Sequence, residues 1–135
     1  MNDTQKKALI LFIISIILTF IDLFTKYKKC AHDEPKIIPE LFLHRAINIF
    51  VYFGWIFDNK IVLIFYLLFE LCVVIHWFTN NFNCFLAEYE NKVCKFDKNT
   101  RYDYIFRFFK LRTAIVITIT LKILVLFIVF YKLFL

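Results

Sequence analysis

The sequence predicts an all-α fold, an integral membrane bundle of four transmembrane helices. Two observations lead to this prediction. Hydrophobic residues make up 61% of the 135 positions, including 19 Phe, whereas soluble domains hold about 45–50%. One Gly and two Pro leave little turn-forming material. A water-soluble core of this size could not bury so much apolar surface, so we expect lipid to be the solvent and residues 1–135 to form a single membrane domain.

The four predicted spans are apolar segments at residues 8–24, 41–57, 61–79 and 113–131. The fourth rises ~28 Å as a helix, close to the thickness of a bilayer's hydrocarbon core. The first follows Lys6 and Lys7 in the manner of a signal peptide. It is longer than the roughly 7–15 apolar residues of such a peptide and no small-residue cleavage site follows it, so we expect it to be retained.

The second segment is the least certain span by composition, because it carries His44, Arg45 and Asn48. Only residues 58–60 separate it from the third segment, which predicts a tight helical hairpin. An interfacial helix is the alternative for this segment, and the distribution of charge decides between the two.

Basic residues favour four spans over three. With four spans, the termini and the 58–60 turn share one face that holds four basic residues, whereas the opposite face holds twelve. With three spans, the two basic loops would fall on opposite faces. Because cytoplasmic loops carry the excess of Lys and Arg, we expect non-cytoplasmic termini and cytoplasmic loops at 25–40 and 80–112. The twelve are Lys26, Lys28, Lys29, Lys36, Arg45, Lys92, Lys95, Lys98, Arg101, Arg107, Lys110 and Arg112.

Residues 101–112 alternate basic and aromatic side chains just before the fourth span. This pattern predicts a basic interfacial helix, and a plain positive flank of the span is the alternative. The formal net charge of the chain is +6. Because the basic residues flank apolar segments, we expect anionic lipid headgroups as partners and no nucleic acid.

Two charged residues near the middle of predicted spans are expected to pair. Glu70 lies nine residues in from Ile61, and Lys122 lies nine residues in from Tyr131. Antiparallel third and fourth spans therefore place both charges near the midplane. Each charge alone would cost about 2.5–3.5 kcal/mol, so we expect a Glu70–Lys122 ion pair. Fixing the register of the helices is the expected role, and movement of protons or ions is the alternative.

A second polar cluster is predicted toward the cytoplasmic ends of the first three spans. It comprises Asp22, His44, Arg45, His76 and Trp77. A His and a carboxylate from different helices could bind a metal, but two such ligands do not make a site. We therefore expect Asp22 to hydrogen-bond Arg45 or His76, with no metal and no other cofactor.

The four cysteines contain no C-x-x-C pair. Cys84 and Cys94 enclose nine residues, a loop that a disulfide could span. The predicted cytoplasmic location favours reduced thiols, and a reversed orientation would favour a bridge. Cys84 and His76 could form a catalytic pair, but the sequence identifies neither an oxyanion donor nor an orienting group for them.

The most distinctive stretch follows the third span and contains Asn80, Asn81, Asn83, Cys84, Leu86 and Glu90. Three Asn at a membrane boundary indicate a helix end whose carbonyls need partners. The order His-Trp, Asn-Asn, Cys-x-Leu and an acidic residue resembles small uncharacterised membrane proteins of large DNA viruses and protists. It is also similar to a bacterial four-span family of unknown function, with Cys-Pro-Leu-Thr and a Glu six residues after the Cys. Phe85 and Ala87 depart from that second pattern. The resemblance implies a helical membrane fold and no established activity.

Three functions follow from these observations. The leading hypothesis is a non-enzymatic protein that scaffolds or organises a membrane through helix contacts and basic loops, with homo-oligomers or other membrane proteins as partners. The second is a proton or ion pathway through Asp22, Glu70, His76 and Lys122. The third is a membrane-embedded enzyme that acts on lipid or quinone, with His76 and Glu90 or Cys84 as candidate groups. That enzyme would need a ligand-sized pocket between the second and third spans.

Overall fold

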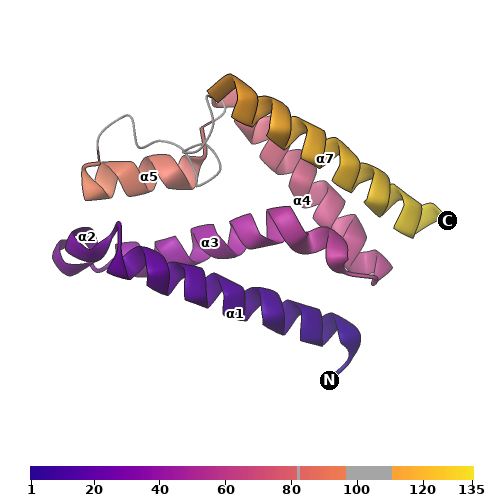
Figure 1. The fold of residues 1–135 in the computed structure, drawn as a ribbon, viewed down its shortest axis with the longest axis horizontal. Coiled ribbons are helices and arrows are strands. Elements are labelled where there is room, and N and C mark those ends of the chain that lie inside the picture. Colours follow the sequence, from indigo (N-terminus) through magenta and orange to yellow (C-terminus); the bar gives the residue numbers. More distant parts are fainter. Residues whose placement is uncertain (82, 97–110) are drawn as a thin grey trace.

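The computed structural model describes residues 1–81, 83–96 and 111–135, and it is all-helical within these ranges (Figure 1). Its elements are α1 (Asp3–Phe24), α2 (Lys28–Asp33), α3 (Ile37–Phe53), the 3-10 helix η1 (Gly54–Ile56), α4 (Lys60–Thr79), α5 (Phe85–Cys94) and α7 (Leu111–Phe134). The basic helix predicted at 101–112 lies outside the described residues except for its last two positions, which begin α7.

Four of these helices are long and apolar enough to cross a membrane: Asp3–Phe24, Ile37–Ile56, Lys60–Thr79 and Arg112–Phe134. The all-helical fold and the four candidate spans are therefore confirmed, and they fit a multi-pass membrane protein. The first helix begins earlier than predicted because Asn2 and Gln5 form a capping box, each side chain accepting from the other's backbone N–H. The second begins before Pro39, whose missing N–H costs no helical bond in a first turn.

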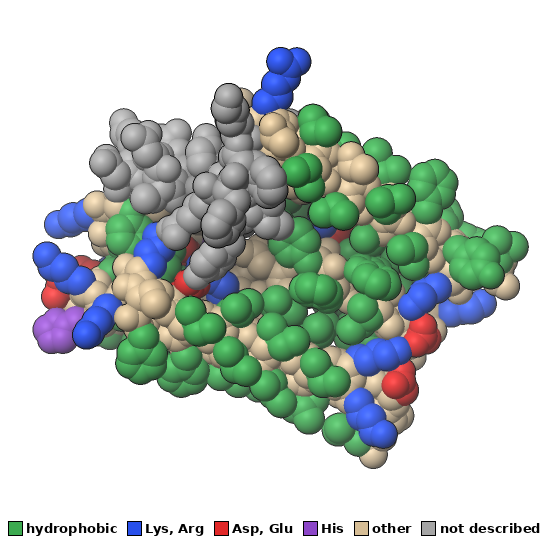
Figure 2. Space-filling model, viewed as in Figure 1, with side chains coloured by type: hydrophobic (Ala, Val, Ile, Leu, Met, Phe, Trp, Pro, Cys, Tyr) green, Lys and Arg blue, Asp and Glu red, His purple; other side chains and the backbone are tan. Residues whose placement is uncertain are grey.

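Charged and apolar side chains occupy different zones of the surface (Figure 2). In this view Lys, Arg, Asp and Glu gather at the two ends of the molecule, and hydrophobic side chains cover the length between them. Large apolar side chains on all four long helices are exposed, including Phe20 on α1, Leu43 on α3, Phe65 on α4 and Phe127 on α7. An apolar band with polar ends is the surface that a bilayer solvates.

The four long helices form two pairs, α1 with α3 and α4 with α7. Figure 1 shows the pairs close together near the connection from α3 to α4 and diverging toward the end that holds α2 and α5. We refer to the space between the diverging pairs as the wedge. Helix α5 lies at the open end of the wedge and packs against α3.

The connection from α3 to α4 depends on Gly54, the single glycine of the chain. A Cβ atom at this position would lie 2.3 Å from the ring of Tyr66. Tyr66 is fully buried, and its hydroxyl donates to the Val51 carbonyl at 2.9 Å. The side chain of Asn59 then caps the first turn of α4. The close approach of Gly54 to Tyr66 brings α3 and α4 together at the closed end of the wedge.

Asp58 joins three elements at this closed end. Its carboxylate binds Lys132 of α7 at 2.8 Å and also contacts Lys7 of α1. The hydrogen bonds from Lys132 and Lys7 lower the pKa of Asp58 to about 2. The turn between α3 and α4 therefore contacts the beginning of α1 and the end of α7, which fits the prediction that the termini and this turn share one face.

Candidate functional site

Cys84, His44 and Glu90 form a hydrogen-bonded line at the open end of the wedge. The Cys84 Sγ lies 3.6 Å from Nε2 of His44, and Nδ1 of the same ring contacts Oε1 of Glu90. His44 and Glu90 are 1% and 2% exposed, whereas Cys84 is partly exposed. A thiol, an imidazole and a carboxylate in this order form the arrangement in which a base activates a nucleophile and a third group orients the base.

The line depends on the position of α5. Cys84 immediately precedes the first turn of α5 and Glu90 lies within the helix, so α5 supplies two of the three groups. After α4, Asn81 adopts a left-handed conformation with φ 49°, which Asn tolerates better than most residues. The Asn80 side chain donates to the Asn83 carbonyl at 3.0 Å. The asparagines form a turn that reverses the chain so that α5 packs against α3, whereas the last carbonyls of α4 accept from the Thr79 hydroxyl.

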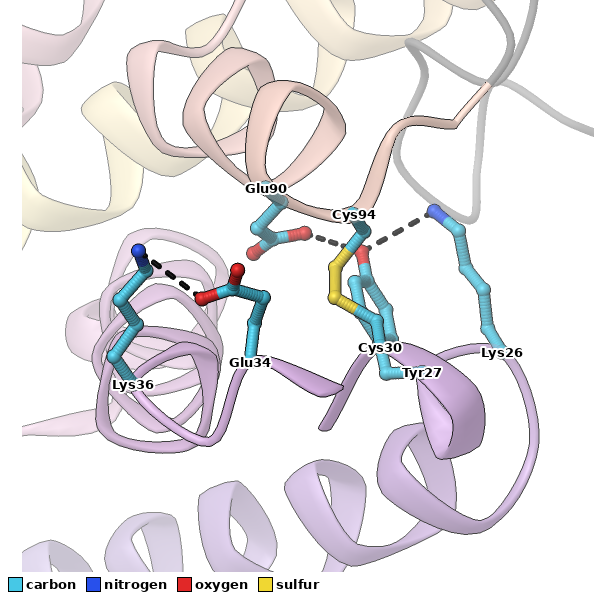
Figure 3. Close-up of a disulfide and its surroundings, with 7 residues drawn as sticks. All are labelled: Lys26, Tyr27, Cys30, Glu34, Lys36, Glu90 and Cys94. Atoms are coloured by element: carbon cyan, nitrogen blue, oxygen red, sulfur yellow. Dashed lines mark hydrogen bonds and ion pairs between the residues drawn. A yellow bond between two sulfur atoms is a disulfide. The ribbon is translucent and has the colours of Figure 1, made fainter. Parts of the chain in front are cut away.

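Glu90 is held by a second donor, the hydroxyl of Tyr27, which contacts its Oε2 atom (Figure 3). Burial opposes ionisation of Glu90, but the hydrogen bonds from His44 and Tyr27 and the charge of Arg45 outweigh it and lower the pKa of Glu90. Burial and the adjacent Glu90 raise the pKa of Tyr27, so the phenol keeps its proton and donates. A fixed carboxylate on Nδ1 leaves Nε2 of His44 facing the thiol.

The first turn of α5, directly after Cys84 in the chain, supplies backbone N–H groups. The first turn of a helix leaves its N–H groups without carbonyl partners in the helix, and the first helical bond of α5 is donated by Glu88 to the Cys84 carbonyl. The N–H of Phe85 donates to Nε2 of His76 at 3.3 Å. The N–H of Leu86 lies in the same first turn. The positive end of a helix stabilises negative charge that forms beside it.

An apolar pocket of about 490 Å³ opens beside the thiol, between α3, α4 and α5. This volume falls within the roughly 300–1,000 Å³ of small-molecule sites. Its lining residues are Ile47, Asn48, Val51 and Tyr52 of α3, Phe69, Cys72, Val73, His76 and Trp77 of α4, and Cys84, Phe85 and Leu86. It lies between the second and third spans, the location that the enzyme hypothesis required.

The expected Glu70–Lys122 ion pair forms, and Asp22 binds Arg45, one of its two expected partners. Lys122 Nζ lies 2.5 Å from Oε2 of Glu70 and also donates to the Val51 carbonyl at 3.3 Å. Arg45 Nε contacts Oδ2 of Asp22, with both side chains buried. The first pair joins α4 to α7 and the second joins α1 to α3, so each helix pair contains one buried ion pair.

A disulfide between Cys30 and Cys94 ties the end of α5 to α2 (Figure 3). The expectation of a reduced thiol is therefore wrong for Cys94, whose partner is Cys30. Cys84 remains a free thiol, so the bridge from Cys84 to Cys94 that the spacing allowed does not form. The reason is geometric: these residues lie at opposite ends of α5, ~15 Å apart at 1.5 Å per residue, whereas a disulfide needs Cα atoms within about 7 Å.

The sequence identified Cys84 and Glu90 but assigned the wrong histidine to the thiol. His44 contacts the thiol, whereas His76 and Trp77 line the pocket wall. His76 accepts from Phe85 and does not form the expected pair with Asp22, which binds Arg45. The orienting group that the sequence could not identify is Glu90. Its spacing from Cys84, noted in the bacterial pattern, was the available signal, but only the return of α5 onto α3 connects it to His44.

The described residues contain no group of three or more His, Cys, Asp or Glu side chains that could hold a metal ion. Comparison with known proteins finds no matching family model, no matching curated protein and no matching solved structure. The geometry of the site is therefore the basis for assigning a function.

Proposed function

We propose that this protein is a membrane-embedded enzyme that acts on lipids through the thiol of Cys84. The observation that carries the proposal is the line from Cys84 through His44 to Glu90 at the wall of an apolar pocket. A register-fixing or scaffolding role does not require a thiol, an imidazole and a carboxylate in this order. The pocket between α3 and α4 favours this third hypothesis over the two that the sequence ranked higher.

The chemistry fits an acyl transfer. His44 Nε2 accepts the proton of Cys84 as Sγ attacks a carbonyl carbon of the substrate, while Glu90 stabilises the imidazolium that forms. N–H groups in the first turn of α5 stabilise the oxyanion. The bond from the carbonyl carbon to the leaving group then breaks, and His44 returns the proton to that group. An acyl thioester on Cys84 remains until water or a second acceptor takes the acyl group.

The test measures acylation of Cys84 in the full chain reconstituted in vesicles. We expect the acetyl thioester of N-acetylcysteamine to form an adduct on Cys84, detected by mass spectrometry of the peptides. Cys72 lines the same pocket and serves as the internal reference thiol. Replacing the base with His44→Gln should slow the adduct on Cys84 by about 10²-fold or more. Equal reaction of Cys72 and Cys84, or an unchanged rate in His44→Gln, would refute the proposal.

We propose the orientation that the charge distribution supports, with non-cytoplasmic termini and with the loops at 25–40 and 80–112 in the cytoplasm. The disulfide between Cys30 and Cys94 argues for the opposite orientation, because cytosolic reductants keep most thiols reduced. An experiment that shows which side of the membrane Asn59 and Asn91 each face separates the two orientations.

The scaffold and ion-pathway hypotheses remain proposals with weaker support. The scaffold idea depends on the basic segment at 101–112, of which residues 101–110 lie outside the described part of the chain, and on binding to anionic headgroups or to other copies of the chain. The ion-pathway idea needs its four residues in one line. In the structure Asp22 instead pairs with Arg45, and Glu70 pairs with Lys122. The two ion pairs lie in separate helix pairs.

A further inference from the structure

The pocket extends away from the Cys84 thiol along α3 and α4, and its length and lining indicate the kind of ligand that it holds. Along α4, the lining residues run from Trp77, near the end of the helix that leads to Cys84, to Phe69. These eight positions correspond to ~12 Å at 1.5 Å per residue. Along antiparallel α3, the lining runs in the same direction, from Ile47 to Tyr52. The pocket is therefore longer than a carbonyl group and extends from the thiol toward the closed end of the wedge.

Phe69 and Tyr52 lie at the far end of the pocket, and both contact side chains that do not line the pocket. The ring of Phe69 packs edge-on against Phe50 at 5.6 Å between centroids and stacks with Phe65 at 6.4 Å. The Lys122 ammonium lies 5.6 Å from the ring centroid of Tyr52. Phe69 and Tyr52 therefore form a supported floor to the pocket.

We propose that the pocket holds the hydrocarbon chain of a fatty acyl thioester whose carbonyl lies at Cys84, and that Phe69 and Tyr52 limit the length of that chain. This inference rests on the proposed function of Cys84. Three extended single bonds of a chain span ~3.3–3.6 Å, so the ~12 Å of lined pocket accommodates a chain of about ten carbon atoms. The apolar walls exclude a headgroup, while Asn48 and His76 add polar groups to the lining.

The step transfers an acyl group with balanced bonds and protons. A bond forms between Cys84 Sγ and the carbonyl carbon, and the carbon–sulfur bond of the incoming thioester breaks. The proton of the Cys84 thiol passes to His44 and then to the departing thiol. No oxidant or reductant is consumed, because one thioester replaces another.

The experiment measures the rate of acylation of Cys84 with N-acetylcysteamine thioesters of increasing chain length, using the full chain in vesicles. We expect the fastest adduct with chains of about ten carbons. Phe69→Ala should move the optimum to longer chains, and Val73→Phe, midway along α4 between Phe69 and Trp77, should move it to shorter ones. Leu68→Ala is the matched control, since Leu68 neighbours Phe69 on α4 but is exposed and does not line the pocket.

Each outcome separates this inference from the proposed function. If the acetyl thioester acylates Cys84 but longer chains show no optimum, or if neither Phe69→Ala nor Val73→Phe moves it, the chain-length inference fails and the thiol enzyme stands. If no thioester of any length acylates Cys84, the proposed function itself fails. Phe69→Leu replaces Phe69→Ala if the alanine variant does not fold, and it should produce a smaller shift in the same direction.

Discussion

Glu90 is the residue on which most of the site depends. Its carboxylate is almost completely buried and accepts from Tyr27 and His44 on separate oxygens. A buried charge is tolerated only when it is hydrogen-bonded. The two donors come from the segment before α2 and from α3, so one side chain of α5 links three parts of the chain. Loss of this charge should therefore lower both the stability of the protein and the reactivity of the Cys84 thiol.

The stability that Glu90 contributes should depend on pH in a defined direction. Its pKa in the folded protein is lower than the ordinary value of 4.5, so the charged form favours folding. The contribution is fully present above 4.5 and is lost as the pH falls through the lower pKa of the folded state. At neutral pH we expect Glu90→Gln to reduce the free energy of unfolding by about 1.5–3 kcal/mol.

Thermal or denaturant unfolding in one detergent, for the parent and Glu90→Gln across acid to neutral pH, tests this expectation. The difference in free energy of unfolding between the two proteins should shrink as the pH falls below the ordinary carboxyl pKa. A difference that stays constant or grows toward acid pH would show that Glu90 is not a stabilising carboxylate. Asp33→Asn is the control, because the Asp33 carboxylate is exposed and lies away from Glu90.

At the residue scale, the sequence predicted ion pairs between long helices better than the line from Cys84 through His44 to Glu90. Glu70 and Lys122 could be matched because a helix fixes depth at 1.5 Å per residue. For Asp22 the sequence left Arg45 and His76 open as partners, and the structure pairs it with Arg45. The contact of His44 with Cys84 could not be predicted, because it depends on where a loop turns back, and no periodicity encodes that direction.

At the scale of elements, the turn between α3 and α4 depends on the absence of one Cβ atom. Gly54→Ala would place a methyl group 2.3 Å from the buried Tyr66 ring. The ring would have to move and weaken its bond to Val51. We expect the free energy of unfolding to fall by about 1–3 kcal/mol, the usual cost of overpacking.

A double-mutant cycle checks the cause of that loss. In a Tyr66→Ala background the added methyl group meets only the Phe50 ring, at 3.2 Å, so Gly54→Ala should then cost much less than it does beside Tyr66. The coupling between the two positions should reach about 0.5–3 kcal/mol. Additive effects of the two substitutions would mean that the cost arises from the backbone and not from the ring.

The long helices were predictable as elements and the short ones were not. Apolar segments of bilayer length identify α1, α3, α4 and α7 without tertiary information. Helix α5 has only ten residues, and isolated helices shorter than about 12–15 residues are marginal in water. Its existence depends on the contact of Glu90 with α3 and on the disulfide from Cys94 to Cys30, both of which are tertiary interactions.

At the scale of the whole molecule, the orientation in the membrane is the main prediction to test. Single cysteines introduced as Asn59→Cys and Asn91→Cys, with all four native cysteines replaced by serine, should react with a membrane-impermeant maleimide from opposite sides. The charge distribution predicts that position 91 faces the cytoplasm. Labelling after permeabilisation gives the total reactive thiol as the reference.

The result has clear consequences for the arrangement of spans. Reaction of both positions from the same side would contradict four spans, along with the matched depths of Glu70 and Lys122. Opposite sides with position 91 non-cytoplasmic would support four spans in the reversed orientation, the one that the disulfide favours.

The pocket between α3, α4 and α5 shows that the described part of the chain leaves space within the wedge between its two helix pairs. Within a bilayer, helix pairs gain no hydrophobic stabilisation from meeting each other, so acyl tails of neighbouring lipids can take the place of side chains there. The angle between the pairs would then depend on the length and saturation of those tails. The protein and its annular lipid would share one tertiary structure, and a detergent that removes the lipid would change the shape of the site as well as its surroundings.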